Sequence, residues 1–178
     1  MIERVVLCTL IPLSVLWLSA CGEPQPEERP PDSHAPEPAG RMEAEARFKL
    51  GSNLAAQGRY TEAVEAYLRA AQLAPDLAKI HYNLGNAYFR QRYYSAANEA
   101  YLRVLELDSM HVSARHNLAA TYSRQLNYAR TIEEHEKVLE LDPAHISTYL
   151  DLGTLYFTRG EYERAEALIK KGLKLAPE

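Results

Sequence analysis

Asn83-Leu84-Gly85-Asn86-Ala87-Tyr88 is the stretch that decides the fold, because its pattern returns every 34 residues. A leucine followed by a small residue stands at 50–51, 84–85, 118–119 and 152–153. Later in each interval come a small or short residue and then a bulky one, at Ala63 and Tyr67, Ala97 and Tyr101, Thr131 and His135, and Ala165 and Ile169. A fixed interval of this length predicts a stack of similar structural units.

Each interval carries the signals of two helices. Two helices approach to 8–10 Å only where the side chains at the crossing are small, and Gly51 and Ala63 form such a pair. Gly58 is expected to end the first helix, since glycine adopts the left-handed conformation of a helix end. The second helix should stop before Pro75, which restricts the residue ahead of it. The space around the crossing would be filled by Leu50, Leu54, Tyr67 and Leu73.

These residues resemble the tetratricopeptide repeat (TPR) family over Ala44 to Glu178. The resemblance implies an all-α solenoid of four helix-turn-helix units at 44–77, 78–111, 112–145 and 146–178. The chain departs from the family pattern at several positions. At the fourth position of each unit, where the family has an aromatic residue, this chain has Arg47, His81, Arg115 and Tyr149 in turn. Arg92 and Leu126 replace the turn glycine, which suggests looser turns in units two and three.

The first twenty residues indicate export. Residues 5–18 are almost wholly apolar and Leu18-Ser19-Ala20-Cys21 follows, which is typical of a cleaved secretory signal. The run is short for a membrane span and Pro12 interrupts it, although an uncleaved anchor is the alternative. The tetrad resembles a bacterial lipobox, which implies a signal peptide at 1–20 and a lipidated Cys21, the lipid including palmitate.

Residues 21–40 are expected to form a proline-rich acidic spacer behind the lipid. Six prolines lie among five acidic residues and one arginine, without a large apolar side chain, so the stretch cannot bury a core. Fully extended, its residues from 22 onward reach roughly 60 Å from the membrane. Gly22 after the cysteine points to the outer membrane, because an aspartate there retains such proteins at the inner membrane in enteric-type bacteria.

No motif in the chain predicts catalysis, a cofactor or a metal site. His135 lies at a position held by tyrosine or isoleucine in other units, so we expect a core side chain. His111 and His116 are five residues apart and do not share a helix face, which disfavours a metal pair. Residues 41–178 carry eighteen basic and eighteen acidic residues, and without a basic stripe nucleic acid is not an expected partner.

Recognition of a protein or peptide is the predicted role of the concave face. In the TPR family the first helix of each unit lines this groove, mainly through six positions. Carboxamide side chains there can both donate to and accept from a peptide backbone. The alternative is that the asparagines bridge neighbouring helices. The candidate groove residues are Lys79, Tyr82, Asn83, Asn86, Phe89, Arg90, His116, Asn117 and Arg124.

The last helix is a second candidate interface. The sequence ends at Glu178, just past the fourth unit, and Ile169, Leu173 and Leu175 would then lose the neighbour that covers their equivalents. Exposed apolar surface of this kind marks an interface, so a partner or a second copy would dock there, the latter giving a homodimer. The alternative is that Glu166 and the nearby lysines make the helix polar enough to cap itself.

Together these features predict a lipid-anchored scaffold of the bacterial cell envelope without enzymatic activity. It would bind a protein or peptide in its groove as an assembly factor, at the outer membrane and facing the periplasm. The alternative function is an accessory protein that recognises peptidoglycan or regulates a cell-wall enzyme.

Overall fold

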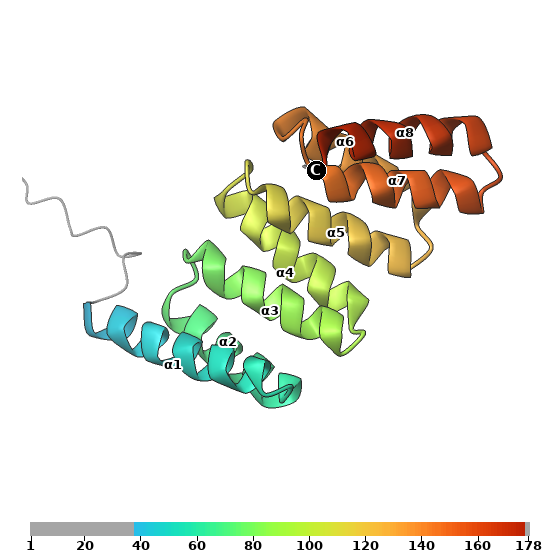
Figure 1. The fold of residues 1–178 in the computed structure, drawn as a ribbon. Coiled ribbons are helices and arrows are strands. Elements are labelled where there is room, and N and C mark those ends of the chain that lie inside the picture. The colour runs from blue at the N-terminus through green and yellow to red at the C-terminus, as the bar shows by residue number, and fades with distance from the viewer. Residues whose placement is uncertain (1–37, 177–178) are drawn as a thin grey trace, which may run out of the picture. The chain divides into compact units, whose positions relative to one another are not determined.

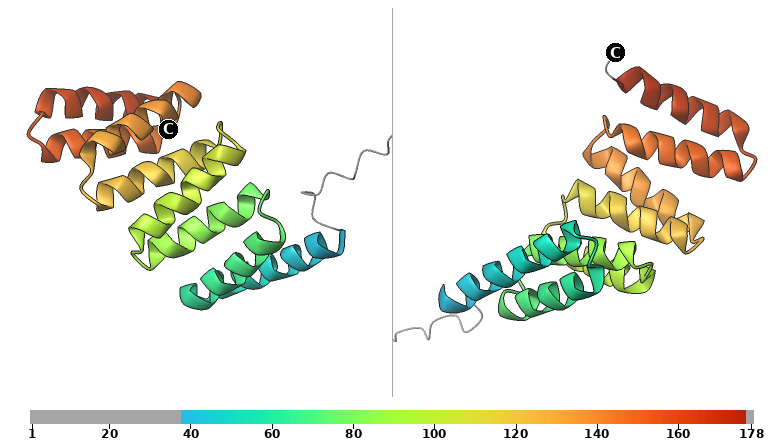
Figure 2. Two further views of the ribbon diagram at one scale, coloured as in Figure 1. Left: turned by 180° about the vertical axis from the view of Figure 1, so that it is seen from behind. Right: turned by 60° about the horizontal axis from the view of Figure 1, so that its bottom comes forward.

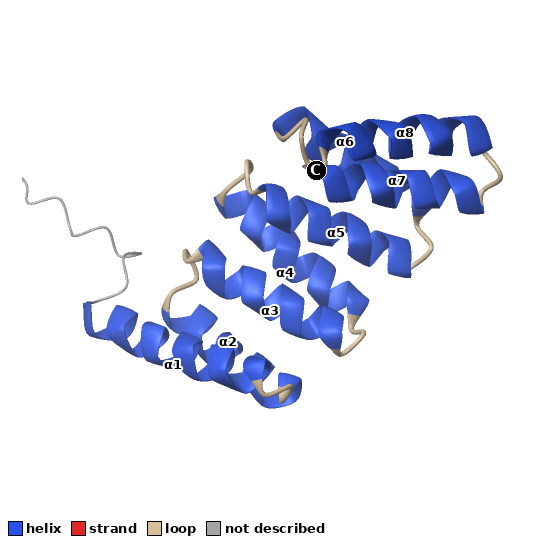
Figure 3. Ribbon diagram, viewed as in Figure 1, coloured by secondary structure: helices blue, strands red, loops and turns tan. Residues whose placement is uncertain are grey.

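The computed structural model describes residues 38–176, which form eight α-helices and no strand (Figures 1 and 3). The all-α solenoid expected from the sequence is confirmed for this part of the chain. Within it, no helix combines the length and the apolar character needed to cross a membrane. The helices are α1 (Pro38–Ala56), α2 (Tyr60–Leu73), α3 (Ala78–Arg90), α4 (Tyr94–Leu107), α5 (Val112–Arg124), α6 (Tyr128–Leu141), α7 (Ile146–Thr158) and α8 (Tyr162–Leu175).

The helices pack in consecutive pairs, α1 with α2 through to α7 with α8. The second helix of each pair also contacts the first helix of the next pair, so the units stack in chain order. Figures 1 and 2 show α1, α3 and α5 side by side along one face. This arrangement places the first helix of successive units next to one another, where they can form a common binding surface.

Helix α1 begins earlier than the sequence suggested. Its first residue, Pro38, lies inside the segment 21–40 that was expected to be spacer. Proline suits the first turn of a helix, because its fixed φ is helical and the amide hydrogen it lacks would have no partner there. The helix therefore takes in the last residues of that segment. The predicted signal peptide at 1–20, the lipidated Cys21 and the rest of the spacer lie outside the described residues.

The paired helices of a unit meet where a residue without a side chain faces a large ring. A Cβ atom added to Gly51 would lie 2.7 Å from the ring of Tyr67, and one added to Gly85 would lie 2.7 Å from the ring of Tyr101. Both distances are well below van der Waals contact. Both tyrosines are almost fully buried. In the third unit the partner of the ring position is Ala119, and the tyrosine is replaced by the smaller His135.

Substituting Gly85 with alanine should therefore destabilise the second unit. The added methyl group forces Tyr101 from its position, and overpacking of this kind costs about 1–3 kcal/mol. Gly40→Ala is the matched control, because an added Cβ there meets nothing within 4 Å. Urea denaturation followed by circular dichroism measures both. Equal stability of the two variants would contradict the close approach.

The inter-helix turns of units two and three are not looser than the others. Arg92 and Leu126 adopt φ of 64° and 59°, and the glycines at the same positions, Gly58 and Gly160, adopt 76° and 77°. The hydrogen bond from each of these four amides to the carbonyl three residues earlier is 3.0 Å long. The expectation of looser turns was wrong, because the same backbone hydrogen bonds close all four turns, although arginine and leucine there adopt a conformation that usually costs about 1–2 kcal/mol.

The varied residues at the fourth position of units two, three and four make the same kind of contact. The side chains of His81, Arg115 and Tyr149 each reach a backbone carbonyl in the preceding inter-unit turn, at 3.0 Å in every case. The three carbonyls belong to Pro75, Ser109 and Pro143, which are themselves 34 residues apart. Any side chain with a suitably placed donor can satisfy this acceptor, so the family's aromatic residue is not required here.

The apolar core runs between units, and this explains the behaviour of the recurring leucines. Leu84 and Leu118 belong to clusters that include residues of the preceding unit, and both are buried. Leu50 is 47 % exposed, although the sequence suggested that it fills the first crossing. The reason is that no helix pair precedes it among residues 38–176.

Candidate protein-binding groove

A groove formed by two adjoining cavities lies along α3, α5 and α7. The first cavity has a volume of about 370 Å³ and the second about 510 Å³, and Phe89 and Ala120 line both. The first is completed by Asn86, Arg90, Tyr101 and Asn117. The second is completed by Ser123, Arg124, Leu126, Tyr128, Thr131, His135, Asp151, Thr154, Leu155 and Thr158. We call these two cavities the groove.

Asn86 and Asn117 join units two and three at the floor of the groove. The Asn117 amide nitrogen donates to the Asn86 side-chain oxygen at 3.0 Å and to the Tyr82 hydroxyl at 3.3 Å. The Tyr101 hydroxyl donates to the same Asn86 oxygen at 2.7 Å. Burial raises the pKa of Tyr101, which keeps this hydroxyl protonated and able to donate. Both asparagines thus bridge helices, and they still line the groove.

Asn83, Lys79 and Tyr82 line neither cavity. Asn83 donates through its amide nitrogen to the backbone carbonyl of Lys79 at 2.9 Å. Lys79 pairs with Glu45, and its ammonium group lies 5.1 Å from the centre of the Phe48 ring. The Tyr82 ring stacks against His111 with the ring centres 5.2 Å apart. Lys79 and Tyr82 therefore connect neighbouring units, through Glu45 and Asn117, whereas Asn83 is bonded within its own helix.

Phe89, Arg90 and Arg124 do line the groove, and Arg92, which occupies a turn and was not among the expected residues, lies beside it. Phe89 packs edge-on against Tyr94, with ring centres 5.8 Å apart. The three arginines and this aromatic pair surround a third cavity of about 240 Å³ beside the groove. Within residues 38–176, none of the three arginines forms an ion pair. The rim therefore combines an apolar ring with uncompensated positive charge.

His116 lies deeper, where units three and four meet. Its ring is 5.4 Å from the ring of His135 and 4.9 Å from that of His145, measured between centres. Its Nε2 atom is 3.7 Å from a carboxylate oxygen of Asp151. Burial lowers the pKa of His116 and lowers that of His135 to about 4, so both rings are neutral at pH 7. Burial also raises the pKa of the Asp151 carboxyl.

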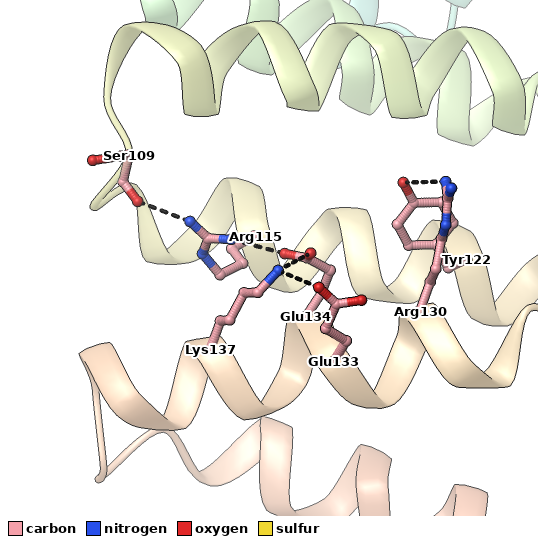
Figure 4. A network of polar contacts seen from close by, with 7 residues as sticks. All are labelled: Ser109, Arg115, Tyr122, Arg130, Glu133, Glu134 and Lys137. Carbon is pink, nitrogen blue, oxygen red and sulfur yellow. Dashed lines mark hydrogen bonds and ion pairs between the residues drawn. The ribbon is translucent and has the colours of Figure 1, made fainter.

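The same unit contains a buried ion-pair network (Figure 4). Arg115 of α5 donates to Glu134 of α6 at 2.8 Å, and the two side chains are only 14 % and 12 % exposed. Lys137 reaches Glu134 at 2.9 Å and Glu133 at 2.7 Å. Units one and two have alanine at the position of Glu134. The arginine and the glutamate are thus a matched replacement within the third unit.

Replacing Arg115 with methionine should cost about 3 kcal/mol of folding free energy, because Glu134 stays buried with only Lys137 as its partner. Arg103→Met is the control, since its ion pair with Glu106 is exposed and is worth less than about 1 kcal/mol. A further Glu134→Ala substitution should restore part of the loss. Denaturation midpoints measure all three. A loss no greater than that of the control would show that the pair does not stabilise the unit.

The part of the groove that sequence reasoning missed comes from α6. Leu126, Tyr128, Thr131 and His135 line the larger cavity, although they belong to a second helix or its preceding turn. These residues line the cavity because α6 packs less closely against α7 than α2 does against α3 or α4 against α5. No sequence signal marks this difference in packing. His135 is 2 % exposed, in agreement with the core position expected for it.

The predicted carboxyl-terminal interface is only partly exposed. Leu173 is 62 % and Leu175 41 % exposed, whereas their equivalents in the other units are half-buried. Ile169 is different, because it packs on Gly153, where an added Cβ would lie 2.5 Å from it. It is nevertheless only half-buried, whereas Tyr67, Tyr101 and His135 at the same position of the other units are buried, so Ile169 has lost part of the cover of its equivalents.

Three sequence profiles of repeat families match the chain. A profile described as TPR repeat matches residues 51–91, and two described as tetratricopeptide repeat match residues 78–111 and 111–178. No curated protein sequence matches the chain. The matched ranges together span the groove and reach all four units.

Solved structures with a similar fold include several of MamA. One crystal structure of MamA is 27 % identical, with a TM-score of 0.72 over 74 % of this chain and 77 % of that one. A second is also 27 % identical, with a TM-score of 0.71 over 77 % and 75 %. A structure of MamA from Desulfovibrio magneticus RS-1, starting at residue 41, is 23 % identical, with a TM-score of 0.70 over 74 % and 75 %.

Proposed function

The chain belongs to the tetratricopeptide repeat family and is a scaffold for protein–protein interaction, and we propose that it binds its partner in the groove while a lipid on Cys21 holds it at the cell envelope. The observation that supports the groove is its composition. Phe89, Arg90 and Arg124 line its wall, and neither arginine forms an ion pair with another described residue. Charged groups left without a partner at a concave surface are available to a ligand.

The chemistry of the groove selects an extended segment with acidic and apolar side chains. Carboxylates would pair with Arg90, Arg92 and Arg124, and an apolar side chain would pack on Phe89. The floor offers further polar groups, since Asn86 uses its oxygen and Asn117 its nitrogen within the protein. The remaining amide nitrogen of Asn86 and the remaining oxygen of Asn117 can meet a peptide backbone, which needs one donor and one acceptor.

Charge reversal in the groove tests this proposal. A photo-cross-linking amino acid at Thr154, inside the groove, should capture a protein in envelope extracts, and the same probe at Leu102 on α4 should not. Adding Arg90→Glu and Arg124→Glu should reduce capture at least about tenfold, because two charge-assisted contacts become repulsive. Arg69→Glu on α2 is the matched control and should leave capture unchanged.

Two results would count against the groove. Equal capture by the probe at Leu102 would place the interaction elsewhere, and so would capture that survives both charge reversals. If the purified protein instead sediments with isolated cell-wall sacculi, the alternative function of peptidoglycan recognition gains support.

The membrane anchor is proposed from the sequence alone. Residues 1–21 resemble a lipoprotein signal with its modified cysteine. Two or more acyl chains hold a protein stably on a bilayer, since each buried methylene contributes about 0.8 kcal/mol. The expected location is the outer membrane, with the repeats facing the periplasm and acting as an assembly factor for an envelope complex.

Cys21→Ser should abolish incorporation of labelled palmitate and move the protein from the membrane pellet to the soluble fraction. Cys8→Ser is the control, because Cys8 lies within the predicted signal and should change neither result. A Cys21→Ser protein that stays in the pellet would indicate an uncleaved membrane anchor instead.

A further inference from the structure

The junction between units three and four is more polar than the others. Neither of the apolar clusters that contain Leu84 and Leu118 includes a residue of α7 or α8. In their place, His135, Thr131 and Thr148 are buried beside the half-buried His116. An apolar core excludes such groups unless they are satisfied by a partner, so this cluster requires an explanation.

Three metal-binding groups converge at this junction. One imidazole nitrogen from His116, one from His135 and a carboxylate oxygen of Asp151 lie within 4.8 Å of one another. The ligand atoms of one Zn²⁺ ion lie about 3.5 Å apart, since each is about 2.0–2.2 Å from the ion. The 3.7 Å between Nε2 of His116 and the Asp151 oxygen is close to that spacing. Small side-chain rotations bring the third atom into range.

His135 supplies an independent sign of a ligand. The residue is 2 % exposed, and its Nδ1 atom is buried without a hydrogen-bond partner among the described residues. A buried polar atom in this state destabilises the fold unless a ligand or water satisfies it. The ring also borders the groove, which gives an ion a route from solvent.

The neighbours of His116 orient it for the same purpose. Its Nδ1 atom is 3.3 Å from the hydroxyl of Thr148, and that hydroxyl is 2.8 Å from Nδ1 of His145. Two arrangements satisfy both contacts, and the one that metal binding requires has His116 donating to Thr148 and Thr148 donating to His145. Nε2 of His116 then carries its lone pair toward Asp151. Metal-binding histidines are typically fixed in this way through their second nitrogen.

We propose that His116, His135 and Asp151 bind a divalent transition-metal ion, with Zn²⁺ the best match to two imidazoles and one carboxylate. Two of these ligands belong to unit three and the third to unit four. The ion would therefore fasten the junction at which α6 packs only loosely on α7. Three protein ligands leave a coordination position open. The proposal does not depend on the identity of the groove's partner.

Zinc titration of the full chain tests the site. The chain carries Cys8→Ser and Cys21→Ser to remove competing thiols, has no affinity tag, and is stripped with chelator and then dialysed. Calorimetry should show one Zn²⁺ per chain. His116→Gln and Asp151→Asn should each weaken binding at least about tenfold. His81→Gln should not, because His81 lies in another unit and contacts the carbonyl of Pro75.

Amide hydrogen exchange provides a second readout that a structural role alone would not change. Zn²⁺ should slow exchange in α7 and α8 of the parent chain and of His81→Gln, but not of Asp151→Asn. The Asp151 side chain is 49 % exposed, so this variant retains the fold. Absence of binding would overturn the proposal, and would indicate that a water molecule satisfies His135. Binding that persists in both ligand variants would also overturn it.

Discussion

The structure depends on how closely the two helices of each unit approach each other. In the first two units that distance is set by a glycine against the ring of a tyrosine. In the second unit, the hydroxyl of this tyrosine, Tyr101, also donates a hydrogen bond to Asn86 on the first helix of the unit. The same contact thus fixes the helix spacing within a unit and positions the polar floor of the groove between units. Packing and recognition are coupled at this residue.

The third unit lacks this contact and is built differently at the same place. Ala119 replaces the glycine and His135 the tyrosine, and Glu134 next to it is balanced by Arg115. Each substitution is matched by a compensating one, so the helix pair keeps its place in the stack. The outcome is a junction with unit four in which imidazole and hydroxyl groups replace apolar contacts. Burial stabilises such a junction less than it stabilises an apolar one, because polar groups gain little free energy from leaving water.

Much of the fold can be predicted from the sequence, because a repeat spacing depends on local signals that recur. Helix ends near Gly58 and Pro75, the paired crossings and the order of the units all came from residues within one interval. The turns at Arg92 and Leu126 could not be predicted, since neither residue type favours the left-handed backbone found there.

The site was harder to predict than the fold. His116 and Asp151 are 35 residues apart in the sequence. The larger cavity of the groove reaches His135 because α6 packs loosely on α7. Asn83 was favoured for the groove by residue type, which does not reveal that its amide is already bonded to its own helix.

The hydrogen bonds from His81, Arg115 and Tyr149 to carbonyls spaced 34 residues apart have a consequence for how such a chain changes in evolution. At each junction between units, a backbone carbonyl at the same position of the turn accepts a hydrogen bond from the side chain at the fourth position of the next unit. A duplication or loss of one whole interval therefore joins a turn to a helix that already fits it. The chain can lengthen or shorten by entire units without new contacts having to arise, whereas a partial interval would leave a carbonyl without its donor.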